Sequence, residues 1–179
     1  ILVRTDVFQH TLTEDDTSIG HLAIGSSYTI GNQLMPFLLR DFRAKSNNKN
    51  QTLLVGNSAL IYQKIKSFEL DIGLVEGRIQ QASIHIQPWL KDEMVVICPP
   101  HHPLAKTKAV ALHDLENNDW IIRESGSGTR EYFMNNIAMH LDNWTATLEL
   151  SSTQAIINCV AAGLGIACLS KSAVSQVIK

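Results

Sequence analysis

Short apolar strands alternate with helix-patterned segments along this chain, and that order constrains its fold more than any other feature. The alternation occurs once in the first half and restarts after Pro99-Pro100. The predicted strands lie at 21–25, 51–55, 71–75, 94–98, 120–123, 145–150 and 165–170, and the predicted helices at 31–44, 58–68, 129–140 and 153–162. Strand–helix–strand order is typical of parallel sheets covered by helices. The sequence therefore predicts an α/β protein of two successive βαβ lobes, with a boundary after Cys98.

The composition excludes several classes of protein. The chain has 179 residues, 45% hydrophobic and 18% charged, which is typical of one globular domain or two small lobes. No apolar run approaches the length of about 20 residues that spans a bilayer, and residues 1–18 lack the features of a signal peptide. The 15 Lys+Arg against 17 Asp+Glu give a net charge of −2, which argues against nucleic-acid binding by this chain alone. We therefore expect neither a membrane protein nor a secreted precursor.

The cysteines indicate a reducing compartment. Cys98, Cys159 and Cys168 are odd in number, widely spaced and set in apolar runs, with no Cys-x-x-Cys pair. Unpaired, buried cysteines are typical of proteins kept in the cytoplasm. We expect a cytoplasmic location.

No combination of residues supports catalysis or metal binding. The string around Ser127 misses the G-x-S-x-G motif of a hydrolase because Ser125 occupies the first glycine position. The nearby glycines are not followed by the Gly-Lys-Ser/Thr of a phosphate loop. His101-His102 has no Cys or His partner at metal-site spacing. We expect no catalytic residue, no metal ion and no cofactor.

Hydroxyl-bearing residues follow three predicted strands, at 25–29, 124–130 and 151–153. Ligands of open α/β sheets bind beyond the carboxyl ends of strands, where helix N-termini present unpaired amides. Such donors, together with Arg123 or Arg130, predict a site for a small anion. The alternative is that Ser and Thr at these positions only cap helices. For the helix expected at 153–162 we predict a capping box formed by Ser151 and Gln154.

Glu76 follows the predicted buried strand at 71–75. Its carboxylate lies at the end of a sheet, which leaves three interpretations open. It accepts hydrogen bonds from a ligand hydroxyl or amine, it pairs with Arg130, or it is an ordinary surface residue.

An ordered set of motifs resembles the effector-binding domain of LysR-type transcriptional regulators. The set comprises Ile24-Gly25-Ser26-Ser27-Tyr28-Thr29-Ile30-Gly31, Leu34-Met35-Pro36, Phe42, Gly56-Asn57-Ser58, Leu70-Asp71-Ile72-Gly73-Leu74-Val75-Glu76-Gly77, His102-Pro103-Leu104-Ala105, Trp120-Ile121-Ile122-Arg123-Glu124, Gly126-Ser127-Gly128-Thr129-Arg130 and Val160-Ala161-Ala162-Gly163-Leu164-Gly165-Ile166-Ala167. Each motif is weak alone, but together they follow the family order from about Gly20 to Ser170.

The resemblance implies two Rossmann-like lobes joined by a hinge, as in type 2 periplasmic binding proteins, with a small, anionic effector in the cleft between them. The lobes would be residues 19–98 (regulatory subdomain I) and 99–179 (regulatory subdomain II). Residues 1–18 would be a remnant of the linker helix or vector-derived sequence, and the return crossover to the first lobe would be missing. The effector site would be lined by nine residues: Ser26, Ser27, Thr29, Glu76, Ser125, Gly126, Ser127, Thr129 and Arg130.

The resemblance also implies partners. The chain would form a homodimer or a higher homo-oligomer and would act on DNA only through an N-terminal helix-turn-helix that this sequence lacks. Effector binding would then control transcription. The main alternative is a solute-binding receptor of a transport system, which would require an export signal. An enzyme on the same scaffold would require a cofactor-anchoring cysteine and an arginine-rich cleft, which this sequence does not offer.

Overall fold

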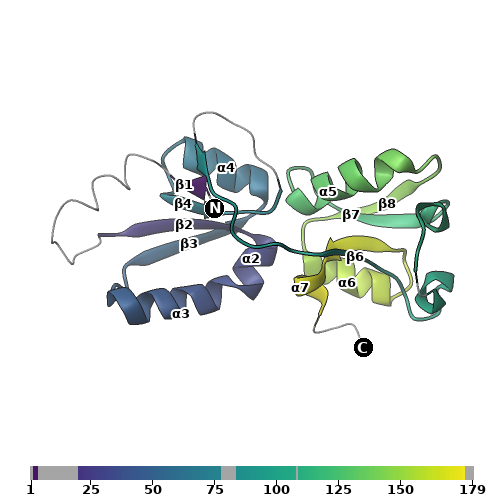
Figure 1. Ribbon diagram of the computed structural model, residues 1–179, viewed down its shortest axis with the longest axis horizontal. Coiled ribbons are helices and arrows are strands. Elements are labelled where there is room, and N and C mark those ends of the chain that lie inside the picture. Colours follow the sequence, from purple (N-terminus) through teal and green to yellow (C-terminus); the bar gives the residue numbers. More distant parts are fainter. Residues whose placement is uncertain (1, 4–19, 78–83, 108, 176–179) are drawn as a thin grey trace. The chain divides into compact units, whose positions relative to one another are not determined.

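Two compact units, Ile1–Lys91 and Asp92–Lys179, make up the computed structural model (Figure 1). It describes residues 2–3, 20–77, 84–107 and 109–175. The division falls after Lys91 rather than after Cys98, because the strand at Met94–Ile97 pairs within the second unit. No helix among the described residues is long and apolar enough to cross a membrane.

The first unit is built on a five-stranded sheet of order β3-β2-β4-β1-β5. Its strands are β1 (Leu2–Val3), β2 (Leu22–Ser27), β3 (Gln51–Gly56), β4 (Ile72–Leu74) and β5 (His85–Ile86), and its helices are α2 (Tyr28–Gln33), α3 (Met35–Ser46) and α4 (Ser58–Lys66). β2 runs parallel to both β3 and β4, whereas β1 is antiparallel to β4 and β5. The carboxyl ends of β2, β3 and β4 therefore meet at one edge of the sheet.

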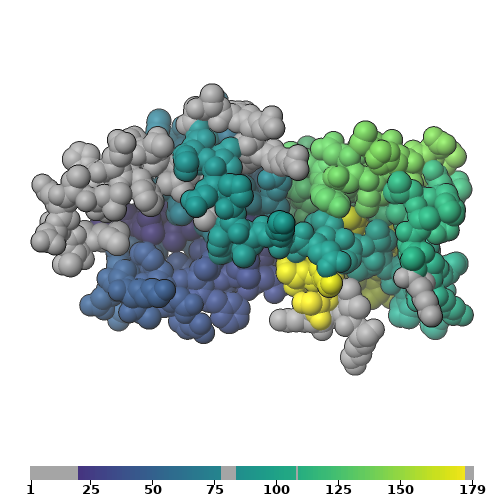
Figure 2. Space-filling view, in the orientation of Figure 1, coloured from purple at the N-terminus to yellow at the C-terminus, as the bar shows by residue number. Residues whose placement is uncertain are grey.

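Helices α3 and α4 lie on opposite faces of this sheet (Figure 1). On the α4 side, Ile61 and Ile65 pack with Leu70. Glycines permit the close approach, because a Cβ added at Gly25 would lie 2.5 Å from a Leu70 methyl carbon. On the other face Ile24, Met35 and Leu74 form a second cluster. The outer surface of α3, blue in Figure 2, is largely exposed to solvent.

The second unit contains two strand pairs. Its elements are the strands β6 (Met94–Ile97), β7 (Asp119–Arg123), β8 (Thr145–Leu150) and β9 (Ala167–Ser170), the helices α5 (Gly128–Asn136), α6 (Thr153–Ala161) and α7 (Lys171–Val174), and the 3₁₀ helices η1 (Pro103–Lys106), η2 (Leu112–Leu115) and η3 (Ala138–His140). β6 is antiparallel to β9, and β7 is parallel to β8. A parallel bridge between Trp120 and Ile166 joins the two pairs.

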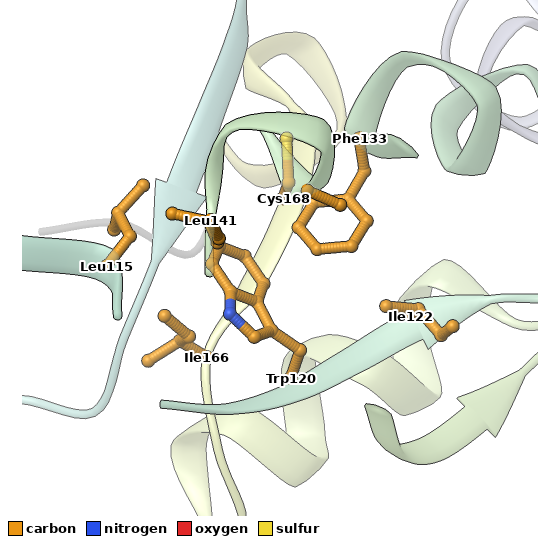
Figure 3. Close-up of a cluster of buried hydrophobic side chains, with 8 residues drawn as sticks. Leu115, Trp120, Ile122, Phe133, Leu141, Ile166 and Cys168 are labelled. Carbon is orange, nitrogen blue, oxygen red and sulfur yellow. The ribbon is translucent and has the colours of Figure 1, made fainter. Parts of the chain in front are cut away.

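Trp120 is the centre of the larger apolar cluster of this unit. Its side chain is fully buried, and its ring lies 4.6 Å from that of Phe133, centroid to centroid. Leu141 and Ile166 surround the indole (Figure 3). Ile121, which points to the other face of β7, packs instead with Ile156 of α6. Alternate residues of β7 thus face two different helices, α5 and α6, as expected for a strand covered on both faces.

The predicted α/β class is confirmed, but one helix start and one helix cap differ from the prediction. The helix expected at 31–44 is two helices, which meet at Leu34, the N-cap of α3, just before Pro36 in the first turn. The predicted Ser151 cap is wrong, because Ser152 caps α6 by accepting from the Ala155 amide at 3.2 Å.

The end of α6 follows the Schellman pattern. Gly163 has a φ of 83°, its amide donates to the Val160 carbonyl, and the Leu164 amide donates to the Cys159 carbonyl.

Gly165 should be the least replaceable glycine of the second unit. Its φ is 152°, and a Cβ there would lie 2.5 Å from the Asp119 carbonyl oxygen, which accepts from the Ile166 amide. Gly165→Ala should lower the free energy of unfolding by about 2 kcal/mol or more, because both backbone strain and the displaced carbonyl oppose folding. Gly20→Ala, with no atom within 4 Å of the added methyl, is the matched control. Equal urea midpoints for the two variants would contradict this packing.

Candidate functional site

The first predicted junction lies where β2 passes directly into α2. Ser26 and Ser27 are the last residues of β2, and Thr29 is inside the first turn of α2. All three side chains are buried. Ser27 is the N-cap of α2, but its hydroxyl accepts from the Ile30 amide over 3.5 Å, longer than an ordinary hydrogen bond. Helix capping therefore gives only a weak reason for a hydroxyl at Ser27 and no reason for the hydroxyls of Ser26 and Thr29.

Ser26 has a hydroxyl with no hydrogen-bond partner in the described part of the chain, although the side chain is fully buried. Its Oγ lies beside Gly31 of α2, where an added Cβ would come within 2.8 Å of it. A buried polar atom without a partner costs about 1–3 kcal/mol, so such atoms are rare in native proteins. A glycine at 31 thus makes room for a hydroxyl that the described residues do not satisfy.

Glu76 lies at the same edge of the same sheet. β2 and β4 align Ser26 with Leu74, so Glu76 follows just beyond the end of β4. The Ser58 hydroxyl, at the start of α4, donates to the Glu76 carbonyl oxygen at 3.2 Å. This hydrogen bond joins the segment after β3 to the segment after β4. The carboxylate atom Oε1 of Glu76 is buried without a hydrogen-bond partner. Sequence reasoning did not select Ser58, although it begins the helix that follows β3.

The second predicted junction is a tight turn between β7 and α5. The Ser127 amide donates to the Glu124 carbonyl at 3.2 Å, and Gly126 has a φ of 84° inside this turn. Ser125 is exposed, whereas Ser127 and Thr129 are buried. Ser127 occupies the N-cap position of α5, but its side chain makes no capping hydrogen bond. The capping interpretation therefore does not account for this serine.

The first turn of α5 presents backbone donors. Only from Glu131 onward do the amides have a carbonyl within the helix, since Glu131 donates to Ser127. The amides of the first helical turn have no helical acceptor and carry partial positive charge. Helix N-termini of this kind bind anions.

Arg123 supports the second junction through hydrogen bonds to neighbouring side chains. Its guanidinium is buried and binds both carboxylate oxygens of Glu124, at 2.8 and 3.1 Å, and it donates to Thr153 Oγ1 at 3.1 Å. This links the end of β7 to the start of α6. These contacts do not support Arg123 as one of the two arginines expected beside a bound anion. Thr153 is a structural partner that the sequence pattern did not reveal.

Arg130 is more exposed and is also paired. It donates to the Arg123 carbonyl oxygen at 3.0 Å and forms an ion pair with Glu149 of β8. Both partners of Arg130 belong to the second unit, as Arg130 itself does. Arg130 thus holds α5 against β7 and β8.

Two of the three cysteines are kept in the thiol form by burial. Burial raises the pKa of the Cys168 thiol to about 12 and raises that of Cys98 as well, so both stay protonated near neutral pH. Among the described residues no group of three or more His, Cys, Asp or Glu side chains is placed to hold a metal ion.

A family model, the LysR substrate binding domain, matches residues 15–179. The chain belongs to this family. The regulator CysL of Bacillus subtilis is 34% identical over 153 residues, covering 86% of this chain and 51% of the relative. The uncharacterized regulator YeiE of Escherichia coli K12 is 38% identical over 157 residues, covering 88% and 53%. This LysR-family chain thus spans about half the length of the curated relatives it matches, which are transcriptional regulators rather than transport receptors.

Solved structures agree with this assignment. The CcmR regulatory domain of Synechocystis PCC6803, solved in complex with 2-PG, has a TM-score of 0.81 and 30% identity, covering 89% of this chain and 76% of that one. The cofactor-binding domain of the regulator Cbl has a TM-score of 0.76 at 21% identity and shows the same fold, covering 90% and 72%. The predicted fold class, of the type 2 periplasmic-binding-protein kind, is confirmed for this LysR domain.

Arg123 should be far more important for folding than Arg130. Arg123→Met leaves the half-buried Glu124 carboxylate without its partner and should lower the free energy of unfolding by about 3 kcal/mol. Arg130→Met removes an exposed ion pair and should cost about 1 kcal/mol or less. Urea unfolding of both variants measures the difference, and equal losses would contradict the buried role of Arg123.

Proposed function

We propose that this chain is the effector-binding part of a LysR-type transcriptional regulator and that it binds a small anionic metabolite through the hydroxyls and amides of its strand-to-helix junctions. The nine residues expected from the sequence are the proposed ligand contacts: Ser26, Ser27, Thr29, Glu76, Ser125, Gly126, Ser127, Thr129 and Arg130. Ligand binding would alter the regulator only to the extent that affinity differs between its conformations.

The observation that carries the proposal is the unused hydrogen-bonding capacity of two buried hydroxyls, those of Ser26 and Ser127. Ser26 Oγ has no partner, and Ser127 does not cap the helix that it precedes. An oxyanion that accepts from such groups and from the α5 amides would satisfy them. Charge-assisted hydrogen bonds of this kind contribute about 1.5–3 kcal/mol each.

The CcmR domain supports the ligand class. It is 30% identical to this chain and was solved in complex with 2-PG, a small anion with phosphate and carboxylate groups. Phosphate and carboxylate groups both accept hydrogen bonds, and the two junctions provide hydroxyl and amide donors. The ligand of this chain is therefore sought among small phosphate, sulfur-oxyanion and carboxylate compounds.

The remaining parts of the function are also proposals. The full regulator would act as a homodimer or a higher homo-oligomer in the cytoplasm. It would contact DNA through a helix-turn-helix domain outside this sequence, because the net charge of −2 gives this chain little affinity for phosphate backbones.

A ligand screen tests the proposal with a variant that separates binding from folding. The chain is melted with phosphate, sulfate, sulfite, 2-phosphoglycolate and small carboxylates, since a ligand of the folded state raises the melting temperature. Ser26→Ala should weaken binding of the active anion by about tenfold while leaving the unliganded melting temperature unchanged or higher, because the lost hydroxyl has no partner in the protein.

Ser27→Ala is a comparison for stability only, because Ser27 is itself a proposed ligand contact. It removes the long cap to Ile30 and should lower the melting temperature slightly. A collapse of the Ser26→Ala melting temperature with unchanged anion affinity would show that Ser26 is structural. No stabilisation of the folded wild-type chain by any anion would reject the proposed ligand class.

A further inference from the structure

The Glu76 carboxylate lies at the same sheet edge as the hydrogen-bond donors of the first junction. A negatively charged side chain is unexpected at a site that binds an anion. Glu76 Oε1 is buried without a hydrogen-bond partner, as is Ser26 Oγ. The two residues belong to neighbouring parallel strands of one sheet, β4 and β2, at the edge where both strands end. One unsatisfied hydroxyl and one unsatisfied acceptor thus lie at adjacent strand ends.

The described contacts of Glu76 are made by its backbone, and its buried Oε1 has no hydrogen-bond partner among the described residues. The Ser58 hydroxyl donates to the carbonyl oxygen of Glu76, not to its side chain. The ion pairs described for the first unit join Arg40 to Asp41 and Lys64 to Glu69, and none reaches Glu76. The Glu76 carboxylate is therefore not neutralised by an ion pair among the described residues of the first unit.

An ionised carboxylate accepts hydrogen bonds and donates none. An oxyanion without a hydrogen of its own would be repelled by it, and the repulsion grows as water is excluded. An anion that also carries a hydroxyl, an ammonium or an acidic proton would instead donate to Glu76, in a short charge-assisted bond. The same ligand would still offer its oxygens to hydroxyls such as that of Ser26.

We infer that Glu76 is a specificity-determining residue that restricts the effector to anions carrying a hydrogen-bond donor and rejects fully deprotonated oxyanions such as sulfate. The inference rests on the proposed function and narrows its ligand class. Such a site should bind a ligand that carries a hydrogen-bond donor more tightly than an isostere that lacks it. The isostere leaves the buried Glu76 oxygen without a hydrogen bond.

Two pairs of probes differ in the donor and little else. Inorganic phosphate keeps a proton near neutral pH and sulfate does not, although both are tetrahedral; glycolate carries a hydroxyl that acetate lacks. Isothermal titration calorimetry at pH 7 should give, for at least one pair, an affinity about tenfold or more higher for the member with the donor.

Substitution at Glu76 assigns the effect. Glu76→Gln keeps the shape and supplies an amide donor, so the affinity ratio of that pair should fall to about threefold or less, mainly through tighter binding of the member without a donor. Glu69→Gln, the same change at an exposed carboxylate of the same unit, should leave the ratio unchanged. Unfolding midpoints of both variants verify that they are folded.

Each contrary result has a distinct meaning. Equal affinities within both pairs in the wild-type chain would overturn the inference and leave the anion site standing. A ratio that survives Glu76→Gln would overturn the role of Glu76. Failure of all four anions to bind the folded chain would reject the proposed anion site itself, and the inference with it.

Discussion

Parallel pairing of strands determines where this protein places its polar groups. β2 pairs with β3 and β4, and β7 pairs with β8, so the carboxyl ends of neighbouring strands meet at one edge in each unit. A helix begins directly after β2, and others begin close behind β3, β7 and β8. The hydroxyls, amides and carboxylate of the candidate site lie at these edges because the parallel order leaves no other place for the junctions.

The junctions differ in whether their polar groups are hydrogen-bonded within the protein. Groups that bond one another stabilise the fold, whereas groups without a partner are the proposed ligand contacts. Arg123, Glu124 and Thr153 satisfy one another and hold the end of β7 to the start of α6. Ser26 Oγ and Glu76 Oε1 have no hydrogen-bond partner among the residues that the structure describes. Trp120 Nε1 is also buried without a partner, but it lies within the apolar cluster around Phe133 and not at a junction. Of these three atoms, two lie at strand ends.

Much of this arrangement was predictable from local sequence signals. Apolar periodicity located the strands, and Gly163 marked the end of α6, because these features depend on neighbours along the chain. The cap of α6 was assigned one residue too early, since three hydroxyl-bearing residues in a row, Ser151 to Thr153, all suit the position. The pairing of Arg123 with Thr153 is a contact across 30 positions and left no local signal. The unpartnered state of Ser26 likewise depends on the packing of α2 through Gly31.

Backbone amide shifts measured by nuclear magnetic resonance would test the anion site most directly. The isotope-labelled chain is titrated with inorganic phosphate against a chloride control at equal ionic strength. The account predicts saturable shifts that are largest for the amides of 26–29 and 128–130, the two junctions that present unused hydroxyls and the first turn of α5. Saturable shifts centred elsewhere in the chain, or none beyond those caused by chloride, would contradict it.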